Sequence, residues 1–543
     1  MLRQRMALYR VILAAIAVLL GLGPVSPAVA ATKVYALVVG ADRYQHLAAL
    51  RGAVNDAELL SKILIKAGIE VHQLIDDQVT RQKVLDGLKA LIAEAQPGDW
   101  IIFTYAGHGG REPLNGSPSD IVDTFLLPSY DNPRPQNAER IINHEFRAIL
   151  QTVPRGVTVL FLADSCHSAS MVRSIFAKGG VASYSFRGTA YGPVVEDALP
   201  PPPKSTDAHG PEALPNVVFI GASLDDQNTP EMTFDGRYHG AVSWYFAKAL
   251  DGEADVNKDG KTTLSELRTY IEVDAREAAS SRQTPQVEFL QTRGNESLPF
   301  VHSSAVHSSM EDDEGFGVYV VGQGTAELAA LNGLVKLVSA ESAADFVWDP
   351  STGIVTNNRA GDLVAERVTS AAALVGVIGK WRAMANLRSV LVRNPLEVRI
   401  GPDVRGARYS AGSFVSIQIG PSKDPALKYL TVLDLTSSGV VQTLYPSSEA
   451  EAEEQNSLSM PALGTQVVGP FGADHIIALR TATRPDRLRD ALRGFACRPS
   501  AAQLVALLNQ VVQETPASVG IVPLYTVSAA TSSRTTAETS TEC

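Results

Sequence analysis

The chain has 543 residues, of which 45% are hydrophobic and 19% are charged, and this length suits roughly two to four domains with separate cores. Its formal net charge is −11 and it has no long basic run, so the composition argues against nucleic acid as a partner. Only three cysteines occur, Cys166, Cys497 and Cys543, which are too few for a disulfide framework.

Residues 1–30 have the pattern of a secretory signal peptide. A positively charged start precedes an apolar stretch from Val11 to Leu22, and Ala28-Val29-Ala30 fits a signal peptidase site. A retained membrane anchor is the alternative, although the stretch is short for a bilayer span of about 20 residues. We expect cleavage after Ala30, no stable membrane span in the mature chain, and a periplasmic or secreted protein.

Strands and helices are expected to alternate over the next part of the chain. Expected strands cover residues 33–40, 70–75, 99–105, 125–127, 157–162 and 217–222, and expected helices cover 54–67, 81–95 and 241–250. Thr80 is a candidate N-cap for the second helix. This alternation predicts a doubly wound α/β sheet, mainly parallel, in which functional sites collect beyond the carboxyl ends of strands.

Two of the expected strands lead into loops with residues suited to nucleophilic catalysis. Tyr105-Ala106-Gly107-His108-Gly109-Gly110 follows one strand, and Asp164-Ser165-Cys166-His167-Ser168 follows another. Both loops should emerge at one edge of the sheet, which brings an imidazole and a thiol together. Cys166 is then the nucleophile and His108 the general base and acid. The N–H groups of Gly109 and Cys166 would bind the oxyanion.

Each of these residues also has a structural interpretation. His108 could be a structural histidine at a strand end, and Cys166 could be a buried structural thiol. A Cys497–Cys543 disulfide would leave Cys166 as a free thiol in an oxidising compartment, which packing alone seldom requires. His167 adjoins the nucleophile, but neighbours in an extended loop point apart, so it is the weaker candidate for the base.

Together these motifs resemble the caspase-like cysteine peptidases of family C14, and bacterial metacaspase relatives in particular. The resemblance rests on His-Gly followed by Asp-x-Cys, on residues 50–57, and on the later segments 221–227 and 240–245. It covers about residues 33–300. It implies a caspase-hemoglobinase fold, a His108–Cys166 dyad, and endopeptidase activity on protein or peptide substrates. Ala106 and Ala169 depart from the serine and glycine that the family usually has there.

The resemblance also implies an acidic specificity pocket that accepts arginine or lysine. Asp56 and Asp164 match the family's positions, and Asp225 or Asp226 would add charge. Carboxylates select a guanidinium through charge-assisted hydrogen bonds. As alternatives, Asp56 would suit the N-terminal turn of a helix, and Asp164 would bond its own loop.

The strand and helix pattern stops between residues 179 and 215, where prolines and glycines gather, and this predicts an exposed loop inside the domain. Arg187 and Lys204 lie in that loop. If the enzyme cleaves after basic residues, we expect self-cleavage at one of them.

Residues 255–266 have the pattern of an EF-hand-type calcium loop. The expected ligands are Asp255, Asn257, Asp259, Lys261 through its carbonyl, Thr263 and Glu266, and Gly260 supplies the turn at the sixth position. Expected helices precede and follow the loop. The alternative is a solvated acidic turn. We expect Ca²⁺ to bind here and to stabilise the late part of the domain.

The predicted organisation ends with a series of smaller units. The peptidase domain covers 31–301, a linker 302–317, a small α/β unit 318–396, a β-sandwich-like domain 397–482, a helical segment 483–527 and a disordered tail 528–543. No cluster of titratable groups in the C-terminal units indicates a site. We expect them to serve interaction or surface attachment through a protein partner.

The sequence therefore predicts an exported cysteine endopeptidase that cleaves after Arg or Lys. One alternative is a catalytically silent caspase-like scaffold that binds protein partners in a calcium-dependent manner. Another is a calcium-binding adhesion protein. Reaction with a peptidyl-arginine electrophile would separate the enzyme from both alternatives.

Overall fold

A computed structural model gives the fold of most of the chain. It describes residues 32–113, 121–131, 137–165, 214–223, 229–279, 283–301, 316–322, 331, 335–358, 362–391, 395–401, 408–420, 424–446, 463–495 and 498–528. Several predictions lie outside these residues: the signal peptide, Cys166, Asp225, Asp226, the loop with Arg187 and Lys204, most of the linker, Cys497 and the tail.

A six-stranded sheet with the strand order β11-β8-β7-β3-β1-β2 forms the centre of the N-terminal domain. Its strands are β1 (Val34–Gly40), β2 (Glu70–Ile75), β3 (Trp100–Ala106), β7 (Thr158–Asp164), β8 (Val217–Gly221) and β11 (Gln286–Glu288). β11 is antiparallel to its neighbour, and the other five strands are parallel. The predicted doubly wound, mainly parallel sheet is confirmed.

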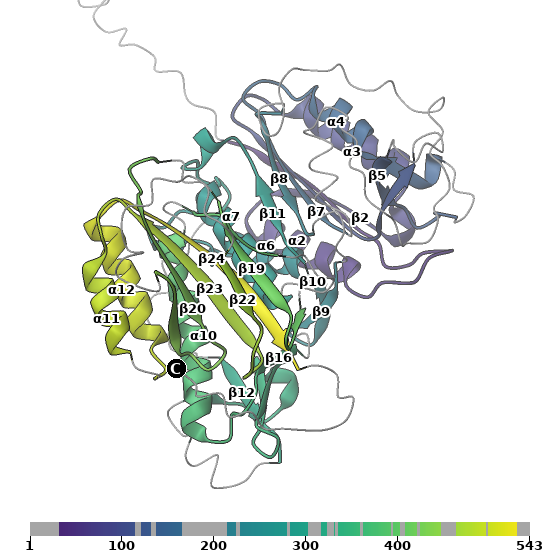
Figure 1. The fold of residues 1–543 in the computed structure, drawn as a ribbon. Coiled ribbons are helices and arrows are strands. Elements are labelled where there is room, and N and C mark those ends of the chain that lie inside the picture. Colours follow the sequence, from purple (N-terminus) through teal and green to yellow (C-terminus); the bar gives the residue numbers. More distant parts are fainter. Residues whose placement is uncertain are drawn as a thin grey trace, which may run out of the picture. The chain divides into compact units, whose positions relative to one another are not determined.

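Helices cover both faces of this sheet (Figure 1). The helices on one face are α2 (Ala53–Lys66), α6 (Ala241–Leu250) and α7 (Leu264–Tyr270), and those on the other are α3 (Arg81–Glu94) and α4 (Asn143–Leu150). Both faces are apolar because alternate side chains of a strand point to opposite sides. In β1, Ala36 and Val38 lie in the core with α2, α6 and α7, whereas Leu37 and Val39 lie in the core with α3 and α4. Thr80 caps α3, as predicted, by accepting the N–H of Lys83 at 3.3 Å.

Smaller elements surround the edge at which β3 and β7 end. Beyond β3 lies a three-stranded sheet of β4 (Gly109–Pro113), β5 (Ile121–Leu126) and β6 (Arg140–Ile142). A hairpin of β9 (Glu231–Phe234) and β10 (Arg237–Gly240) leads directly into α6. After α7 the chain continues through a π-helical turn, η5 (Ile271–Ala275), into α8 (Arg276–Ala278). Short 3₁₀ helices are η1 (Asp76–Gln78), η2 (Asn137–Glu139), η6 (Gln291–Arg293) and η7 (Glu341–Ala343).

The next part of the chain is a small α/β unit, as predicted from the sequence. Its sheet has the order β13-β12-β14-β15-β16, and the helix α10 packs against it. The elements are β12 (Gly317–Val320), β13 (Lys336–Leu337), β14 (Phe346–Asp349), β15 (Ile354–Asn357), β16 (Asp362–Ala365) and α10 (Ala371–Leu391). Val318, Phe346 and Trp348 of the sheet meet Leu374 and Trp381 of the helix in one core.

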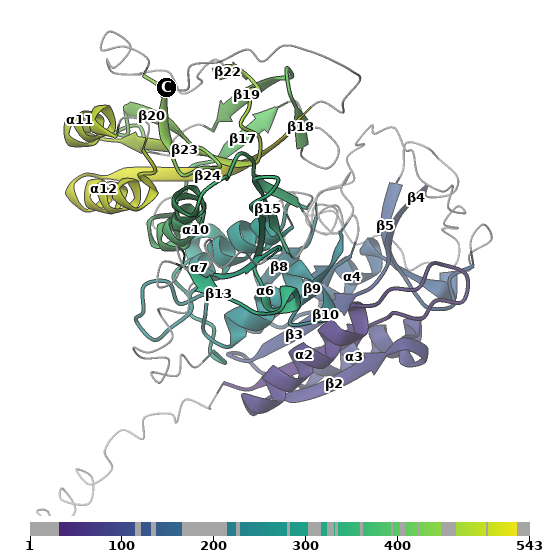
Figure 2. The ribbon, with the colours of Figure 1, turned by 90° about the horizontal axis from the view of Figure 1, so that it is seen from below.

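Two further sheets pack face to face and form a sandwich-like arrangement. One contains β17 (Val398–Gly401), β19 (Phe414–Ile419) and β22 (Leu463–Gln466), and the other contains β18 (Arg408–Ser410), β24 (Ala517–Val527), β23 (Ala473–Thr481), β20 (Tyr429–Leu435) and β21 (Val441–Tyr445). Val415 and Ile417 of the first sheet share a core with Ile476 of the second. Helices α11 (Asp486–Gly494) and α12 (Ala501–Glu514) cover the outer face of the larger sheet (Figures 1 and 2).

The segment 483–527, predicted as helical, contains both helices but ends in a strand. β24 lies between β18 and β23 in the sheet. Its pairing partners lie far away or across two helices in the sequence, so the local pattern does not reveal its place. Among the described residues, no helix combines the length and the apolarity that a bilayer span requires.

Candidate active site

The backbone of His108 is held by two tyrosines. His108 follows β3, and its N–H donates to the hydroxyl oxygen of Tyr44 at 2.8 Å. Its carbonyl oxygen accepts from the Tyr105 hydroxyl at 2.9 Å and from the N–H of Leu126 at 3.0 Å. Both sides of the residue are therefore fixed before its side chain makes any contact, which is the preorganisation that a catalytic base needs.

The imidazole of His108 has a defined orientation. Nε2 lies 2.8 Å from the carbonyl oxygen of Ala48. A carbonyl can only accept, so Nε2 carries a proton, and in the neutral form of the ring the lone pair is on Nδ1. The Tyr44 ring meets the imidazole edge to face, with the centroids 4.6 Å apart. Nδ1 is therefore the ring nitrogen that this arrangement leaves to accept a proton.

The end of β7 lies beside the histidine loop. Ala106 pairs with Asp164 in the parallel register, and the N–H of Gly107 donates to the Asp164 carbonyl at 3.3 Å. Ser165 is buried and is the last described residue of this segment, so Cys166, the next residue, lies outside the described part. The backbone thus brings the chain to within one residue of the predicted nucleophile at the edge that His108 occupies. Gly109, the predicted oxyanion donor, begins β4.

Asp56 and Asp164 approach the same place from different elements. Asp56 is 2% exposed on α2, and its Oδ1 lies 2.8 Å from Nδ1 of His239 while its Oδ2 accepts the N–H of Gly240 at 3.0 Å. Asp164 Oδ2 accepts the N–H of Ser243 in the first turn of α6 at 2.8 Å. A side chain on Gly240 would stand 2.3 Å from that Asp164 oxygen, so only glycine fits between the two carboxylates.

Burial dominates the electrostatics of these groups. It raises the pKa of Asp56, and the neighbouring charge of Asp164 raises it further. Burial also raises the pKa of Asp164, against the hydrogen bonds from Ser243. The pKa of His239 falls to about 4 because of burial and the nearby Arg237. Asp164 Oδ1 has no hydrogen-bond partner within the described residues.

Two more acidic residues contact the backbone at the start of α2. Asp42 Oδ1 accepts the N–H of Ala53 at 2.8 Å, and burial raises the pKa of Asp42 to about 6, with Glu231 and Asp76 adding to the shift. Glu231 accepts the N–H of Gly52 at 2.6 Å. These contacts place negative charge at a helix N-terminus, where it is favourable. Asp225 and Asp226 lie outside the described residues, so their contribution stays a prediction.

The predicted calcium loop has the backbone of a tight acidic turn. Gly260 has φ +84°, and its N–H donates to Asp255 at 2.8 Å. The N–H of Asp259 donates to Asn257 Oδ1 at 2.8 Å. No group of three or more His, Cys, Asp or Glu side chains gathers as a metal site among the described residues. The carboxylates therefore hold the loop's own N–H groups.

The end of the loop is joined to a second segment of the same domain. The N–H of Leu264 donates to the Glu296 carbonyl, and the N–H of Leu298 donates to the Thr262 carbonyl, both at 2.9 Å. Glu266 caps α7 with Thr263 through Oε2, and its buried Oε1 has no partner within the described residues. One buried carboxylate oxygen is thus available to a cation.

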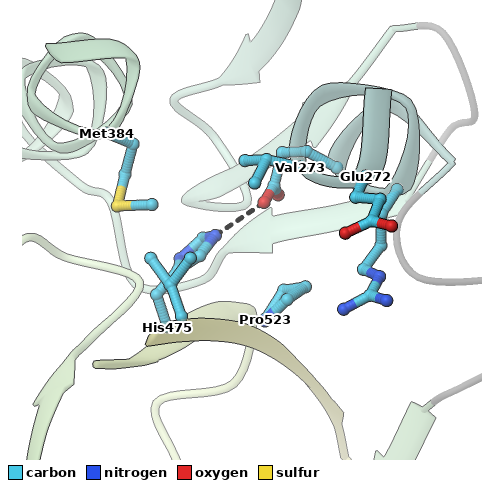
Figure 3. A pocket seen from close by; sticks show the side chains of 8 residues that line it. Glu272, Val273, Met384, His475 and Pro523 are labelled. Atoms are coloured by element: carbon cyan, nitrogen blue, oxygen red, sulfur yellow. Dashed lines mark hydrogen bonds and ion pairs between the residues drawn. The ribbon is translucent and has the colours of Figure 1, made fainter. Parts of the chain in front are cut away.

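A second histidine–carboxylate pair lies far from His108 in the sequence (Figure 3). His475 Nε2 lies 2.8 Å from Glu277 Oε2, and the Tyr525 hydroxyl donates to Glu277 Oε1 at 2.6 Å. They border a small pocket that is also lined by Glu272, Val273, Arg276, Met384, Ile521 and Pro523. It contains no nucleophile, so it is not a candidate for the catalytic site.

Sequence reasoning missed Tyr44, Ala48, His239 and Ser243. Ala48 and Ser243 act through backbone groups, which leave no signal in the sequence. His239 precedes the glycine that begins a motif used for the family resemblance, so a buried partner for Asp56 was within reach of the sequence. Tyr44 stands shortly after β1, and nothing local distinguishes it from an exposed loop tyrosine.

The N-terminal domain is similar to known proteins. Residues 33–295 match the family model described as the caspase domain. Metacaspase-1 of Coccidioides immitis is 28% identical over 253 residues, which are 40% of this chain and 54% of that protein. Metacaspase-1B of Neurospora crassa is 28% identical over 255 residues, 40% of this chain and 58% of that protein. The chain thus spans little more than half the length of these relatives.

Parts of the chain are also similar to solved structures. A protein of Geobacter sulfurreducens has a TM-score of 0.36 at 21% identity and covers 50% of this chain and 99% of its own. Caspase-1 from Spodoptera frugiperda has a TM-score of 0.31 at 11% identity and covers 51% and 92%. The family match gives the N-terminal domain the caspase fold.

Proposed function

We propose that this chain, whose residues 33–295 have the fold of a caspase domain, is a cysteine endopeptidase with Cys166 as nucleophile and His108 as base. One observation carries the proposal. The loop that presents His108 is hydrogen-bonded, through Gly107, to the end of the strand that leads into Cys166. The orientation of the imidazole, with its lone pair on Nδ1, supports the same roles.

The proposed reaction uses these groups in sequence. Nδ1 of His108 takes the proton of the Cys166 thiol, and the sulfur attacks the carbonyl carbon of the substrate. The N–H groups of Gly109 and Cys166 bind the resulting oxyanion. The imidazolium then gives its proton to the leaving amine, and a thioester remains. Water, deprotonated by the same imidazole, hydrolyses the thioester and releases the acid and the free thiol.

We propose that the cleaved bond follows Arg or Lys. The support is the gathering of buried carboxylates beside Gly240, where Asp164 Oδ1 has no partner within the described residues. Asp56 is already engaged by His239 and Gly240. Asp164 is therefore the carboxylate that would bond a guanidinium or ammonium, while Asp56, whose charged form a bound cation would favour, adds negative potential from behind. Asp225 and Asp226 are proposed to add to that charge.

The direct test is covalent labelling with a peptidyl-arginine electrophile. We expect stoichiometric labelling of Cys166 in the wild type and none in Cys166→Ala. A matched electrophile with aspartate at the same position should react far more slowly. Failure of both reagents to label a folded wild-type protein would favour the catalytically silent scaffold or the adhesion protein. Intact mass after incubation tests self-cleavage at Arg187 or Lys204, which should occur in the wild type alone.

We also propose that residues 255–266 bind Ca²⁺. The turn at Gly260 suits a hard cation with oxygen ligands, and so does the buried Glu266 Oε1, which has no partner among the described residues. Asp255, Asn257, Asp259, Thr263, Glu266 and the carbonyl of Lys261 would be the ligands. Calcium should then raise the melting temperature of the wild type but not of Asp259→Ala. An equal rise in both proteins would remove the proposal.

Export and partner binding complete the proposal. The signal-like pattern of residues 1–30 supports export to the periplasm or medium, and the mature chain should then begin at Ala31. N-terminal sequencing of the protein from its native host tests this directly, since a start at Met1 would contradict it. The β-rich units after residue 316 are proposed to bind a surface or protein partner.

A further inference from the structure

We propose that Tyr44, which lies in the segment Asp42–Leu50, here called the support segment, is a positioning residue for His108. The proposal rests on the proposed function, because it assigns the base a support. Tyr44 touches neither the thiol nor the substrate in this account. It acts only through His108.

Tyr44 contacts His108 in two independent ways. Its hydroxyl accepts the backbone N–H at 2.8 Å, and its ring packs edge to face against the imidazole at a centroid distance of 4.6 Å. The hydroxyl also bonds that of Tyr105, which in turn holds the His108 carbonyl. One side chain thus fixes both the backbone and the ring plane, so its loss should affect orientation before it affects stability.

The same segment supplies the third contact of the base. Ala48, four residues after Tyr44, holds Nε2 of His108 with its carbonyl oxygen at 2.8 Å. Because the ring contact and the carbonyl contact come from one short segment, a shift of that segment would move both together. The imidazole would then lose its defined plane and its defined tautomer at once.

The support segment is itself anchored at its start by Asp76. Asp76 Oδ1 accepts the N–H groups of Asp42 and Arg43, both at 2.9 Å, and Oδ2 lies 2.8 Å from Nε of Arg43. Asp76 has φ +45°, a region that non-glycine residues rarely occupy. Such a conformation persists only where contacts enforce it, which indicates that this anchor is built into the fold.

Close packing limits other arrangements at the base. The Tyr44 hydroxyl stands 2.7 Å from where a side chain on Gly107 would begin. The N–H of Gln45 donates to the Pro128 carbonyl at 2.8 Å, and the N–H of Leu50 donates to the Asp42 carbonyl at 2.9 Å. The support segment is therefore held at both ends and near its middle, with Tyr44 directed at His108.

The test compares Tyr44→Phe with Tyr270→Phe in the full mature chain. Phe keeps the ring at position 44 but leaves the His108 N–H without its acceptor. Tyr270 is a buried tyrosine of the same domain, with its hydroxyl 2.9 Å from Glu253 Oε2, so it matches the loss of a hydrogen-bonded hydroxyl away from the base. Asp76→Asn is a second variant that weakens the anchor without a change in volume.

Two readouts separate positioning from general damage. The ¹⁵N shifts of the His108 ring should report a proton on Nε2 in the wild type and in Tyr270→Phe, with changed or broadened signals in Tyr44→Phe. The kcat of Tyr44→Phe should fall by about tenfold with KM unchanged, because a misplaced base slows chemistry and not binding. Asp76→Asn should change both readouts in the same direction and by less.

The outcomes are distinguishable. Unchanged His108 ring signals in Tyr44→Phe, or an equal loss of kcat in Tyr270→Phe at a similar melting temperature, would overturn the inference. If the wild type cleaves no peptide and no electrophile labels Cys166, the proposed function fails. The ring signals still decide whether Tyr44 orients His108 in that case.

Discussion

Two histidine–carboxylate pairs in this protein have the same separation and opposite electrostatics. His239 and Asp56 are 2.8 Å apart in the caspase-type domain, and His475 and Glu277 are also 2.8 Å apart, between α8 and β23. Both histidines are almost fully buried. The distance between the two groups therefore says little about the charge state of a pair, because the groups around the pair determine that state.

The charges of the groups around the two pairs differ in sign. Asp56 is surrounded by other acids, so burial and the charges of Asp164 and Glu231 raise its pKa. At Glu277, burial alone would raise the pKa, but His475, the Tyr525 hydroxyl and Lys380 together lower it. The first pair thus favours a form without net charge, and the second holds a charged carboxylate. Concentrated acids are expected where a cation is to be bound, and a balanced cluster where elements are to be joined.

Breaking the first pair should have the largest effect. We expect Asp56→Asn to lower kcat/KM for arginyl substrates by about 100-fold, because a cation bound beside Asp164 favours the charged form of Asp56 and the loss of that charge removes about 3 kcal/mol. Glu277→Gln serves as the matched control and should leave this value unchanged. The measurement is steady-state cleavage of peptides with arginine or a neutral residue at the cleaved position. An equal loss on both peptides would mean that Asp56 is purely structural.

Breaking the second pair should affect stability and spare catalysis. Glu277→Ala leaves His475 and the Tyr525 hydroxyl without the carboxylate that they share and removes a negative charge near the buried Lys380, and we expect a loss of about 3 kcal/mol of unfolding free energy. Urea denaturation measures it. Glu514→Ala, which removes an exposed pair with Arg487, is the control and should cost less than about 0.5 kcal/mol. A Glu277→Ala protein as stable as this control would contradict the account.

The smallest effect is a difference in pH dependence. The pKa of Asp42 is raised from 3.8 to about 6, so the folded protein binds its proton more tightly than the unfolded chain. Its contribution to stability is present below pH 3.8 and is lost as the pH rises through about 6. The lowered pKa of Glu277 acts in the opposite sense, with stability lost as the pH falls.

Denaturation curves between about pH 3.5 and 7, a range that includes the ordinary and the raised pKa of Asp42, test this prediction. Relative to the wild type, Asp42→Asn should remove a decline with rising pH, and Glu277→Gln should remove a decline with falling pH. Changes of the same sign in both variants would show that the two regions do not differ in the way described.

Much of the N-terminal fold was predictable, because its signals are local. Apolar runs placed β1, β3 and β7, and the cap at Thr80 placed α3. The meeting of the His108 loop with the end of β7 followed from parallel strands ending at one edge. β24 was missed because a central strand is recognised by its partners, and these lie across two helices or a hundred residues away.

The candidate site was predictable in its reactive side chains and not in their supports. His108, Asp56 and Asp164 carry titratable groups in recognisable motifs. The Ala48 carbonyl and the Ser243 N–H carry none, since every residue has such groups and only the fold selects one. Tyr44 and His239 fall between these cases, as side chains whose role depends on a contact distant in sequence.

The rate of Cys166 alkylation by iodoacetamide, measured against pH in the wild type and in His108→Ala, tests the central claim most directly. The ordinary pKa of a free cysteine is about 8.5. If the thiol and the imidazole meet in the folded chain, Cys166 of the wild type should react well below this pH, and in His108→Ala the apparent pKa of the thiol should return to about 8.5. Identical profiles in the two proteins would contradict it.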